Sequence, residues 1–501
     1  MKEQNEEIDA IVNNAEKPNF QNTIVALERS GSLLERVTTI FGNLLSAETN
    51  DEMQELAEKM MPLLAEHNNS ISLNEKLFAR IKAVYDRKDQ LTLNGEDSML
   101  LQKTYDGFIR SGANLQGEAK EKYRRLNTEL SVLALRFSQN LLKETNNYEL
   151  SLTTSQLEGL PESMLESYAQ TAKEKGKEGN IITLDAPSFI PFMKYCKDRT
   201  LRQQLYMAYN TQCTHDNEYN NMDIIKQLVN IRMELVQLLG YSNYAEYVLK
   251  KRMAETEESV YQLLNQLLEA YSPTAHQEVK EVEELAHRLE GNDFQLMPWD
   301  WAYYSEKLKN EKFKLNEEEL RPYFELSQVK QGVFGLATRL YGITFKENKE
   351  IPVYHPDVDA YEVFDEDGSF FSRTIHRFST LVPEKRSGAW MTSYKEQWIE
   401  NGINSRPHIS VTMNFSKPSA EKPALLTFSE VNTFLHEFGH ALHGIFANST
   451  YATLSGTSVY WDFVELPSQI METLPSRKNF SIHLPNITGQ VNKSRHNSFR
   501  R

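Results

Sequence analysis

The stretch Leu435-His436-Glu437-Phe438-Gly439-His440 contains the pattern His-Glu-x-x-His. A helix advances by about 100° per residue, so His436 and His440 are expected one turn apart on the same face. Two imidazoles at this spacing can hold one tetrahedral Zn²⁺, and the carboxylate between them can take a proton from a zinc-bound water. The same pattern also occurs by chance in amphipathic helices, where the histidines are ordinary surface or core residues. Thr427-x-x-Glu430 predicts a capping box at the start of this helix.

A small β-sheet is expected directly before this helix. Residues 408–415 alternate between polar side chains and the apolar Ile409, Val411, Met413 and Phe415. This alternation is typical of a strand with one buried face. Because a strand edge beside a metal can bind an extended peptide through backbone hydrogen bonds, Ile409–Phe415 is a candidate substrate clamp. A purely structural strand is the alternative.

A catalytic zinc takes three protein ligands and keeps one position open, so a third ligand must come from elsewhere. Four downstream residues are candidates: His443, Asp462, Glu465 and Glu472. The metzincin pattern requires glycine at position 443 and histidine at position 446, but this chain has His443 and Phe446. A site made from positions 436, 440 and 443 of one straight helix would be strained.

A second helix is predicted from Tyr460 to Ile470, with an apolar side formed by Phe463, Leu466 and Ile470. Glu465 on this helix is the best third ligand, because two helices that each donate ligands build a rigid site. Asp462 could orient a ligand histidine or be an ordinary surface carboxylate. Glu430 could do the same, although its capping role is the stronger interpretation.

The composition limits the class of protein. The chain has 501 residues, 40% of them apolar and 25% charged, which predicts a soluble globular protein with two or more subdomains. Its net charge of −15 argues against general nucleic-acid binding. Two cysteines cannot form a disulfide framework, so a reducing compartment is expected. The sequence shows no signal peptide and no apolar run long enough for a membrane span.

Most of the remaining chain predicts helices. Residues 118–142 are a long amphipathic run whose apolar stripe is expected in the core. Residues 256–289 predict another long helix, with Leu263, Leu264, Leu267 and Leu268 on one side.

Several motifs together resemble the thimet-oligopeptidase-type zinc peptidases, nearest to the bacterial peptidyl-dipeptidases and oligopeptidase A. The resemblance covers nearly the whole chain. It is carried by residues 436–443, Ser455-Gly456-Thr457, residues 461–469, Asn22-Thr23-Ile24, Pro298-Trp299-Asp300-Trp301 and Ser387-Gly388-Ala389-Trp390-Met391.

The resemblance implies that His436, His440 and Glu465 hold one Zn²⁺ and that Glu437 is the general base. It implies a mainly α, elongated, two-part body around a deep channel, with a small sheet next to the metal helix in a zincin-like, gluzincin arrangement. The implied activity is hydrolysis of short peptides, with removal of C-terminal dipeptides as the first expectation. An endo-acting oligopeptidase and a non-catalytic peptide-binding scaffold are the alternatives. A cytoplasmic monomer is expected, without nucleic-acid or membrane partners.

We expect four regions along the chain. Residues 1–150 form an N-terminal helical region, and residues 151–350 a central helical region in which the peptidase domain starts. Residues 351–472 form the zinc-binding core with the small sheet, and residues 473–501 an aberrant tail.

Two stretches depart from the resemblance. The family continues well beyond Glu472, whereas the tail from Thr473 to Arg501 contains no Asp or Glu. The chain is therefore expected to be C-terminally truncated or frameshifted, and its amino terminus could be clipped. Residues 372–380, Ser-Arg-Thr-Ile-His-Arg-Phe-Ser-Thr, replace an apolar strand of the family, which a short compensated frameshift would explain. We expect the zinc site to form but the chain to hydrolyse peptides poorly, since losing one oxyanion donor costs about 10²–10³ in rate.

Overall fold

The computed structural model describes residues 1–314, 317–379, 385–415 and 423–474. Within them the helices are α1 Lys2–Val12, α2 Ala26–Glu28, α3 Ser32–Ala47, α4 Asp51–Ser72, α5 Glu75–Tyr85, α6 Gly95–Arg110, α7 Gly117–Asn147, α8 Glu162–Glu174, α9 Ala186–Tyr195, α10 Arg199–Asn210, α11 Met222–Leu238, α12 Tyr244–Leu249, α13 Glu257–Glu290, α14 Trp301–Phe313, α15 Leu326–Tyr341, α16 Phe428–Ile445 and α17 Glu465–Glu472. The strands are β1 Leu150–Leu152, β2 Asn180–Ile182, β3 Thr344–Glu347, β4 Val358–Phe364, β5 Phe370–Ser379, β6 Trp390–Lys395, β7 Trp398–Glu400, β8 Ile403–Ser405 and β9 His408–Phe415.

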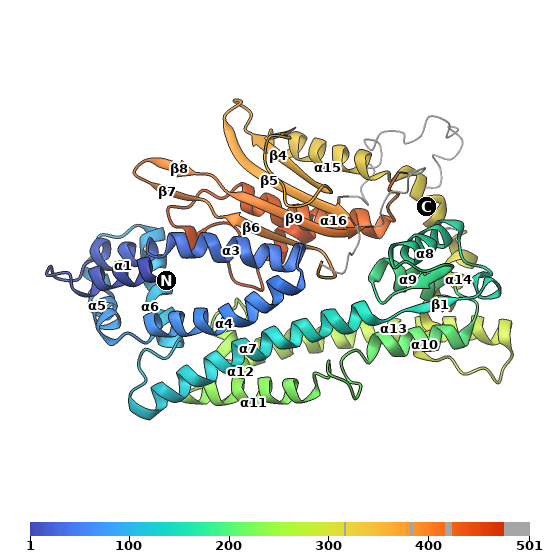
Figure 1. Cartoon of the computed structure of the whole chain (residues 1–501), viewed down its shortest axis with the longest axis horizontal. Helices are drawn as coiled ribbons and strands as arrows, with labels where there is room; N and C mark the ends of the chain where they lie inside the picture. The colour runs from blue at the N-terminus through green and yellow to red at the C-terminus, as the bar shows by residue number, and fades with distance from the viewer. Residues whose placement is uncertain (315–316, 380–384, 416–422, 475–501) are drawn as a thin grey trace.

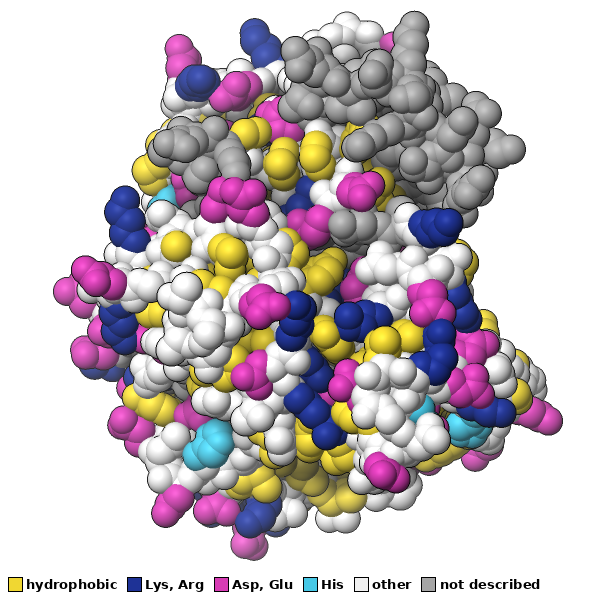
Figure 2. All heavy atoms as spheres, turned by 90° about the vertical axis from the view of Figure 1, so that its right-hand side faces the viewer, with side chains coloured by type: hydrophobic (Ala, Val, Ile, Leu, Met, Phe, Trp, Pro, Cys, Tyr) yellow, Lys and Arg dark blue, Asp and Glu magenta, His cyan; other side chains and the backbone are white. Residues whose placement is uncertain are grey.

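The molecule is mainly helical and elongated, as predicted (Figure 1). The long helices α4, α7, α11 and α13 run along one side, and the largest sheet with α15 and α16 lies on the other. The helices α8, α9, α10 and α14 gather at one end. Figure 2 shows that end with acidic and basic side chains interspersed, so the net negative charge does not form one acidic patch there. Among the described helices, none is long and apolar enough to cross a membrane.

The largest sheet has five strands in the order β3-β4-β5-β9-β6. β5 and β9 are parallel, and the other neighbours are antiparallel. The strand predicted at 408–415 is confirmed, but the prediction of one buried face is wrong. Ser410 and Thr412 are as buried as Val411, because β9 lies inside the sheet and both of its faces are covered.

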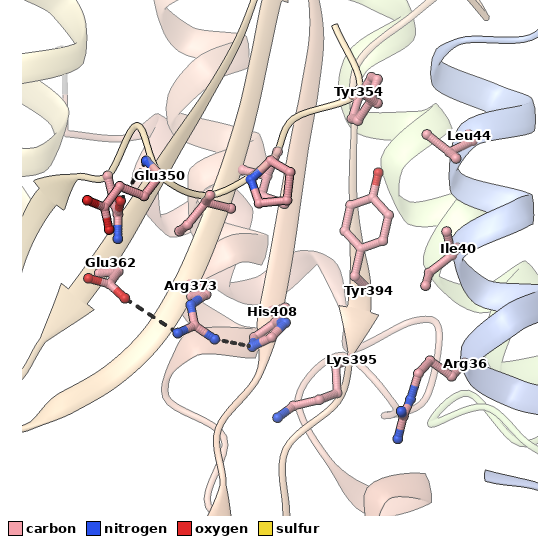
Figure 3. Close-up of a pocket in the computed structure, with 14 residues that line it drawn as sticks. Arg36, Ile40, Leu44, Glu350, Tyr354, Glu362, Arg373, Tyr394, Lys395 and His408 are labelled. Carbon is pink, nitrogen blue, oxygen red and sulfur yellow. Dashed lines mark hydrogen bonds and ion pairs between the residues drawn. The ribbon is translucent and has the colours of Figure 1, made fainter. Parts of the chain in front are cut away.

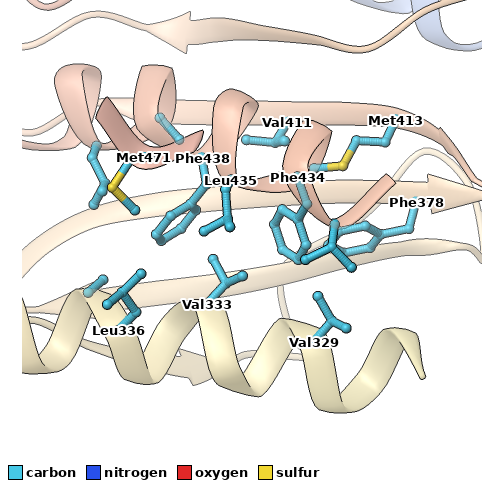
Figure 4. Close-up of a cluster of buried hydrophobic side chains, with 14 of the residues drawn as sticks. Val329, Val333, Leu336, Phe378, Val411, Met413, Phe434, Leu435, Phe438 and Met471 are labelled. Atoms are coloured by element: carbon cyan, nitrogen blue, oxygen red, sulfur yellow. The ribbon is translucent and has the colours of Figure 1, made fainter. Parts of the chain in front are cut away.

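The main hydrophobic core lies between one face of this sheet and the helices α15 and α16 (Figure 4). α15 contributes Val329, Val333 and Leu336, and α16 contributes Phe434, Leu435 and Phe438. Val411 and Met413 from β9 meet these side chains from the sheet. Each fully buried apolar side chain contributes about 1.5–3 kcal/mol, so this core fixes α16 against the sheet.

The predicted capping box at the start of α16 is confirmed. The Thr427 hydroxyl accepts a hydrogen bond from the Glu430 N–H at 3.1 Å, and the Glu430 carboxylate accepts one from the Thr427 N–H at 2.7 Å. These bonds satisfy backbone donors that have no partner inside the helix. The cap therefore fixes where the metal-binding pattern falls along α16.

The two long helices predicted in the first part of the chain are confirmed as α7 and α13. Leu126 and Leu133 of α7 are buried, as the prediction of a core stripe requires. The apolar side of α13 behaves differently, because Leu263, Leu264 and Leu268 are each more than half exposed. Amphipathic spacing predicted the helix correctly but not what covers its apolar side.

Residues 372–379 of the departing segment supply most of β5, an interior strand, and residue 380 lies outside the described residues. Thr374 and His376 are fully buried on the face that carries the main core. Both ring nitrogens of His376 lack a hydrogen-bond partner among the described residues, and the ring lies 5.5 Å from that of Phe334 and 5.7 Å from that of Phe378. Burial among these rings lowers the pKa of His376 to about 3. The frameshift stays a hypothesis. Whatever the origin of the segment, burying the Thr374 hydroxyl and the His376 ring without hydrogen-bond partners in the described part of the chain lowers the free energy of unfolding. The tail beyond Leu474 lies outside the described residues.

Replacing His376 with Leu is expected to stabilise the protein at neutral pH by about 1–3 kcal/mol, because two buried unpartnered nitrogens disappear. The pH dependence should also change. His376 binds a proton more readily in the unfolded chain, so the free energy of unfolding falls as the pH drops from 6.5 towards 3. The variant should lack this part of the loss. Urea unfolding across that pH range measures both effects.

His276→Leu is the matched control, because His276 is exposed on α13. Equal changes in the two variants would contradict the assignment of the effect to burial at position 376.

Candidate metal centre

His436 and His440 lie one turn apart on α16, as the spacing predicts. Their ring centroids are 4.9 Å apart and the rings are nearly perpendicular, at 85°. The side chain of His440 is 12% exposed and that of His436 is 26% exposed. The two Nε2 atoms therefore face a space that solvent can reach from one side.

Glu465 is the first residue of α17, and its carboxylate lies against both rings. Its Oε2 atom is 3.3 Å from Nε2 of His436 and 3.2 Å from Nε2 of His440. The three donor atoms lie within 4.8 Å of one another. Ligands at 2.0–2.1 Å from a tetrahedral zinc are about 3.3–3.4 Å apart, so this donor set fits such an ion with little movement.

A close approach of two helices puts Glu465 in this position. A Cβ atom on Gly439 of α16 would lie 2.6 Å from Cα of Ser468 and 2.7 Å from the carbonyl oxygen of Pro467. Only glycine therefore lets α17 pack this near to α16. The Ser468 hydroxyl hydrogen-bonds the Glu465 carboxylate at 2.8 Å, which fixes the direction of that side chain.

Glu472 supports His436 from the side away from this donor set. Its Oε1 atom is 2.5 Å from Nδ1 of His436, and its other oxygen accepts a hydrogen bond from the Asn432 amide at 3.4 Å. A proton on Nδ1 shared with this carboxylate leaves the Nε2 lone pair facing Glu465 and His440. The sequence made Glu472 a candidate ligand but did not reveal this orienting role.

Glu437 points to the sheet side of α16 and is 6% exposed. Its carboxylate accepts a hydrogen bond from the backbone N–H of Met391 in β6. The pKa of Glu437 is raised to about 7, chiefly by burial; the nearby Glu465 acts in the same direction, and His436 acts against it. A carboxylate with this pKa can both accept and return a proton near neutral pH.

The other sequence candidates have different partners. The Asp462 carboxylate accepts a hydrogen bond from the backbone N–H of Ala254 at 3.0 Å, and Glu430 caps α16. His443 is not part of the donor group, and its Nδ1 atom is buried without a partner among the described residues. The structure therefore brings together His436, His440 and Glu465 from the candidates.

The predicted bounds and apolar side of the second helix are wrong. α17 begins at Glu465, which places Pro467 in the first turn, where its missing N–H costs no helical hydrogen bond. Leu466 and Ile470 are half exposed, whereas Ser468 and Met471 are buried. α17 packs against Gly439 through the backbone of Pro467 and Ser468, so its buried side is not its most apolar side.

The strand predicted as a substrate clamp cannot offer a free edge. β9 is hydrogen-bonded to β5 on one side and to β6 on the other. The edge of the described sheet on this side is β6, which carries Met391 next to Glu437. All six residues of β6 are partly exposed. Alternation identified a strand correctly but could not give its place in the sheet.

Comparison with known proteins gives a consistent result. The sequence profile of Peptidase family M3 matches residues 192–484. The dipeptidyl carboxypeptidase of Escherichia coli (strain K12) is 40% identical over 483 residues, which cover 94% of this chain and 69% of the relative. Oligopeptidase A of the same organism is 35% identical over 478 residues, which cover 93% of this chain and 69% of the relative. The organellar oligopeptidase A of Arabidopsis thaliana is 32% identical over 474 residues, which cover 91% of this chain and 59% of the relative.

Replacing Glu472 with Gln is expected to weaken the binding of a divalent metal about 10–100-fold, because His436 loses its charged orienting partner. Competition with a chromogenic chelator measures the affinity. Asp462→Asn is the matched control, since this carboxylate bonds Ala254 instead. Equal affinities for the wild type and Glu472→Gln would contradict the orienting role.

Replacing Gly439 with Ala should destabilise the protein by about 1–3 kcal/mol and weaken metal binding, because the new methyl group pushes α17 away from α16. A helical Gly→Ala change in open space is instead stabilising. Gly335→Ala on α15 provides that comparison, because nothing lies within 4 Å of its Cβ position. Thermal unfolding and the same chelator competition test both variants, and metal binding unchanged in Gly439→Ala would refute the packing argument.

Proposed function

The chain belongs to peptidase family M3 and is a metallopeptidase, and from this premise we propose that it hydrolyses short peptides with one zinc ion held by His436, His440 and Glu465. One observation carries the proposal: a single carboxylate oxygen lies 3.2–3.3 Å from both imidazole nitrogens. Two imidazoles and one carboxylate are the ligands of catalytic zinc sites that keep a fourth position for water or substrate. When bound, the zinc polarises the peptide carbonyl and makes water more acidic.

In this proposal Glu437 is the general base. Its carboxylate takes a proton from the attacking water and delivers it to the amine that leaves. The Met391 N–H holds the carboxylate in place, and burial keeps its pKa high. A bound cation would lower that pKa, so the carboxylate would be ionised and ready to accept a proton at neutral pH.

We further propose that the substrate lies along β6 as an added strand. β6 has no strand partner on its outer side within the described sheet, and its backbone contacts Glu437. An extended peptide on this edge would form backbone hydrogen bonds that do not depend on its side chains. This arrangement fits an enzyme that accepts many short peptides.

Removal of C-terminal dipeptides is the specificity we favour, because the dipeptidyl carboxypeptidase of Escherichia coli is 40% identical to this chain. Internal cleavage is the second candidate, favoured by the 35% identity to oligopeptidase A. We also propose that the protein is cytoplasmic, since both cysteines, Cys196 and Cys213, are buried free thiols, as expected in a reducing compartment. We propose separately that it is a monomer.

Replacing Glu437 with Gln is expected to lower the hydrolysis of a short peptide about 10²–10⁴-fold while zinc remains bound. Mass spectrometry of a digest of one peptide with a free and an amidated C-terminus measures the rate and identifies the products. If dipeptides are released only from the peptide with a free C-terminus, the enzyme removes C-terminal dipeptides. If internal fragments form from the free and the amidated peptide alike, it cleaves internally.

The zinc content of each sample is measured in parallel, and Asp462→Asn serves as the control for a carboxylate outside the donor set. A Glu437→Gln variant as active as the wild type would refute the role of Glu437. A wild-type chain that binds zinc but cleaves neither peptide would favour the non-catalytic alternative.

A further inference from the structure

A cavity of about 860 Å³ lies on the face of the sheet opposite α16 (Figure 3). Its walls come from α3, from residues 348–354 and from the strands β4, β5, β6 and β9. Arg373 and Ile375 of β5 point into it, whereas Thr374 and His376 point to the main core. None of the three metal-centre donors lines this cavity, so it is a separate feature of the molecule.

Three cationic side chains from three different elements line the cavity, with Arg36 and Lys395 at one end and Arg373 beside His408. Arg36 comes from α3, Arg373 from β5 and Lys395 from β6. Arg373 pairs with Glu362 at 3.4 Å and donates to Nε2 of His408 at 3.3 Å. Lys395 donates to the Ser405 hydroxyl at 3.0 Å. Within the described residues, neither Arg36 nor Lys395 forms an ion pair with a carboxylate, so this end of the cavity carries excess positive charge.

The pKa shifts of two lining residues, Lys395 and His408, agree with an excess of positive charge at this end of the cavity. Burial lowers the pKa of Lys395, and the neighbouring Arg373, Arg36 and Arg406 lower it further. Burial also lowers the pKa of His408 to about 4, and the charges of Lys395 and Arg373 act in the same direction. His408 is therefore neutral at pH 7 and adds no charge. An anion among the three cations would relieve their mutual repulsion.

The rest of the cavity wall is mixed: Glu350 and Glu362 line the side away from α3, and the wall next to α3 is apolar. Ile40 and Leu44 of α3 face the ring of Tyr394, and Tyr354 lies beyond them. Figure 3 shows Arg36 and Lys395 at one end of this wall, below Tyr394. A ligand that lies along α3 and Tyr394 therefore meets positive charge at one end and apolar side chains and an aromatic ring along its length.

We propose that this cavity binds an organic carboxylate with an apolar or aromatic body. The carboxylate lies between Arg36, Arg373 and Lys395, where guanidinium and ammonium groups donate charge-assisted hydrogen bonds. The body packs on Ile40, Leu44 and Tyr394. Both small aromatic acids and the free C-termini of short peptides have this chemistry. A bound ligand touches both α3 and the strands, and so adds to the contacts that join the N-terminal helices to the sheet.

Calorimetric titration of the full chain tests the proposal with 3-phenylpropionate and with its uncharged amide. We expect the acid to bind and the amide to bind at least about tenfold more weakly, because a hydrogen bond between two charged groups is lost. Titration with glycylphenylalanine and with its amide distinguishes a peptide C-terminus from a small acid. Binding of either carboxylate, with its amide weaker, supports the proposal.

Lys395→Gln and Arg36→Gln should each weaken the acid roughly tenfold. Arg36 is exposed on α3, so its variant keeps the test valid if Lys395→Gln fails to fold. Lys346→Gln on the exposed strand β3 is the matched control and should bind as the wild type does. Equal binding of acid and amide, unchanged binding in both cavity variants, or no binding at millimolar concentrations would overturn the proposal. Inorganic phosphate that displaces the acid with equal affinity would also overturn it, because the apolar wall would then contribute nothing.

Discussion

The geometry of the candidate metal centre depends on a contact between two backbones. Gly439 of α16 leaves no room for a Cβ atom beneath the Pro467–Ser468 backbone of α17. A glutamate side chain is short. Glu465 can reach both imidazole nitrogens only because the two helices touch at this point. The Ser468 hydroxyl, on the same turn, then holds that carboxylate in its direction. Gly439, which has no side chain at all, is therefore as necessary to the geometry as the two histidines.

The same helix makes a second close contact on its other side. A Cβ atom on Gly444 would lie 2.7 Å from Cδ1 of Ile409 and 2.9 Å from Cε of Met391. Met391 therefore packs under α16 with its side chain while its backbone N–H bonds Glu437. The donor set is fixed by α17 and the proposed base by β6, so two glycines on one helix bring two different elements to the same reaction space. This explains how one turn of α16 can carry a buried carboxylate, Glu437, and two partly exposed imidazoles, while the third donor comes from α17.

The sequence predicted those parts of the site that depend on local spacing. His436 and His440 share a face because the helical repeat places them there, and the capping box fixes the start of the helix. Spacing left the third donor open among four residues; the predicted second helix favoured Glu465, and the family resemblance implied the same residue. The role of Glu472 was missed because its partner lies 36 residues away on another helix. Alternation likewise found β9 but not its neighbours, since strand order is set by tertiary pairing.

β5 shows how a strand can fit its sheet while its side chains do not fit their surroundings. The ladder to β4 and β9 uses backbone groups, so it forms with polar residues as well as with apolar ones. The side chains then meet two environments. His376 faces the aromatic core without a hydrogen-bond partner among the described residues, whereas Arg373 faces the cavity and finds Glu362 and His408. Arg373 belongs to the segment that departs from the family pattern, but Arg36 and Lys395 lie outside it. The positive end of the cavity therefore does not depend on that departure alone, because two of its three cations come from elements that the departure does not touch.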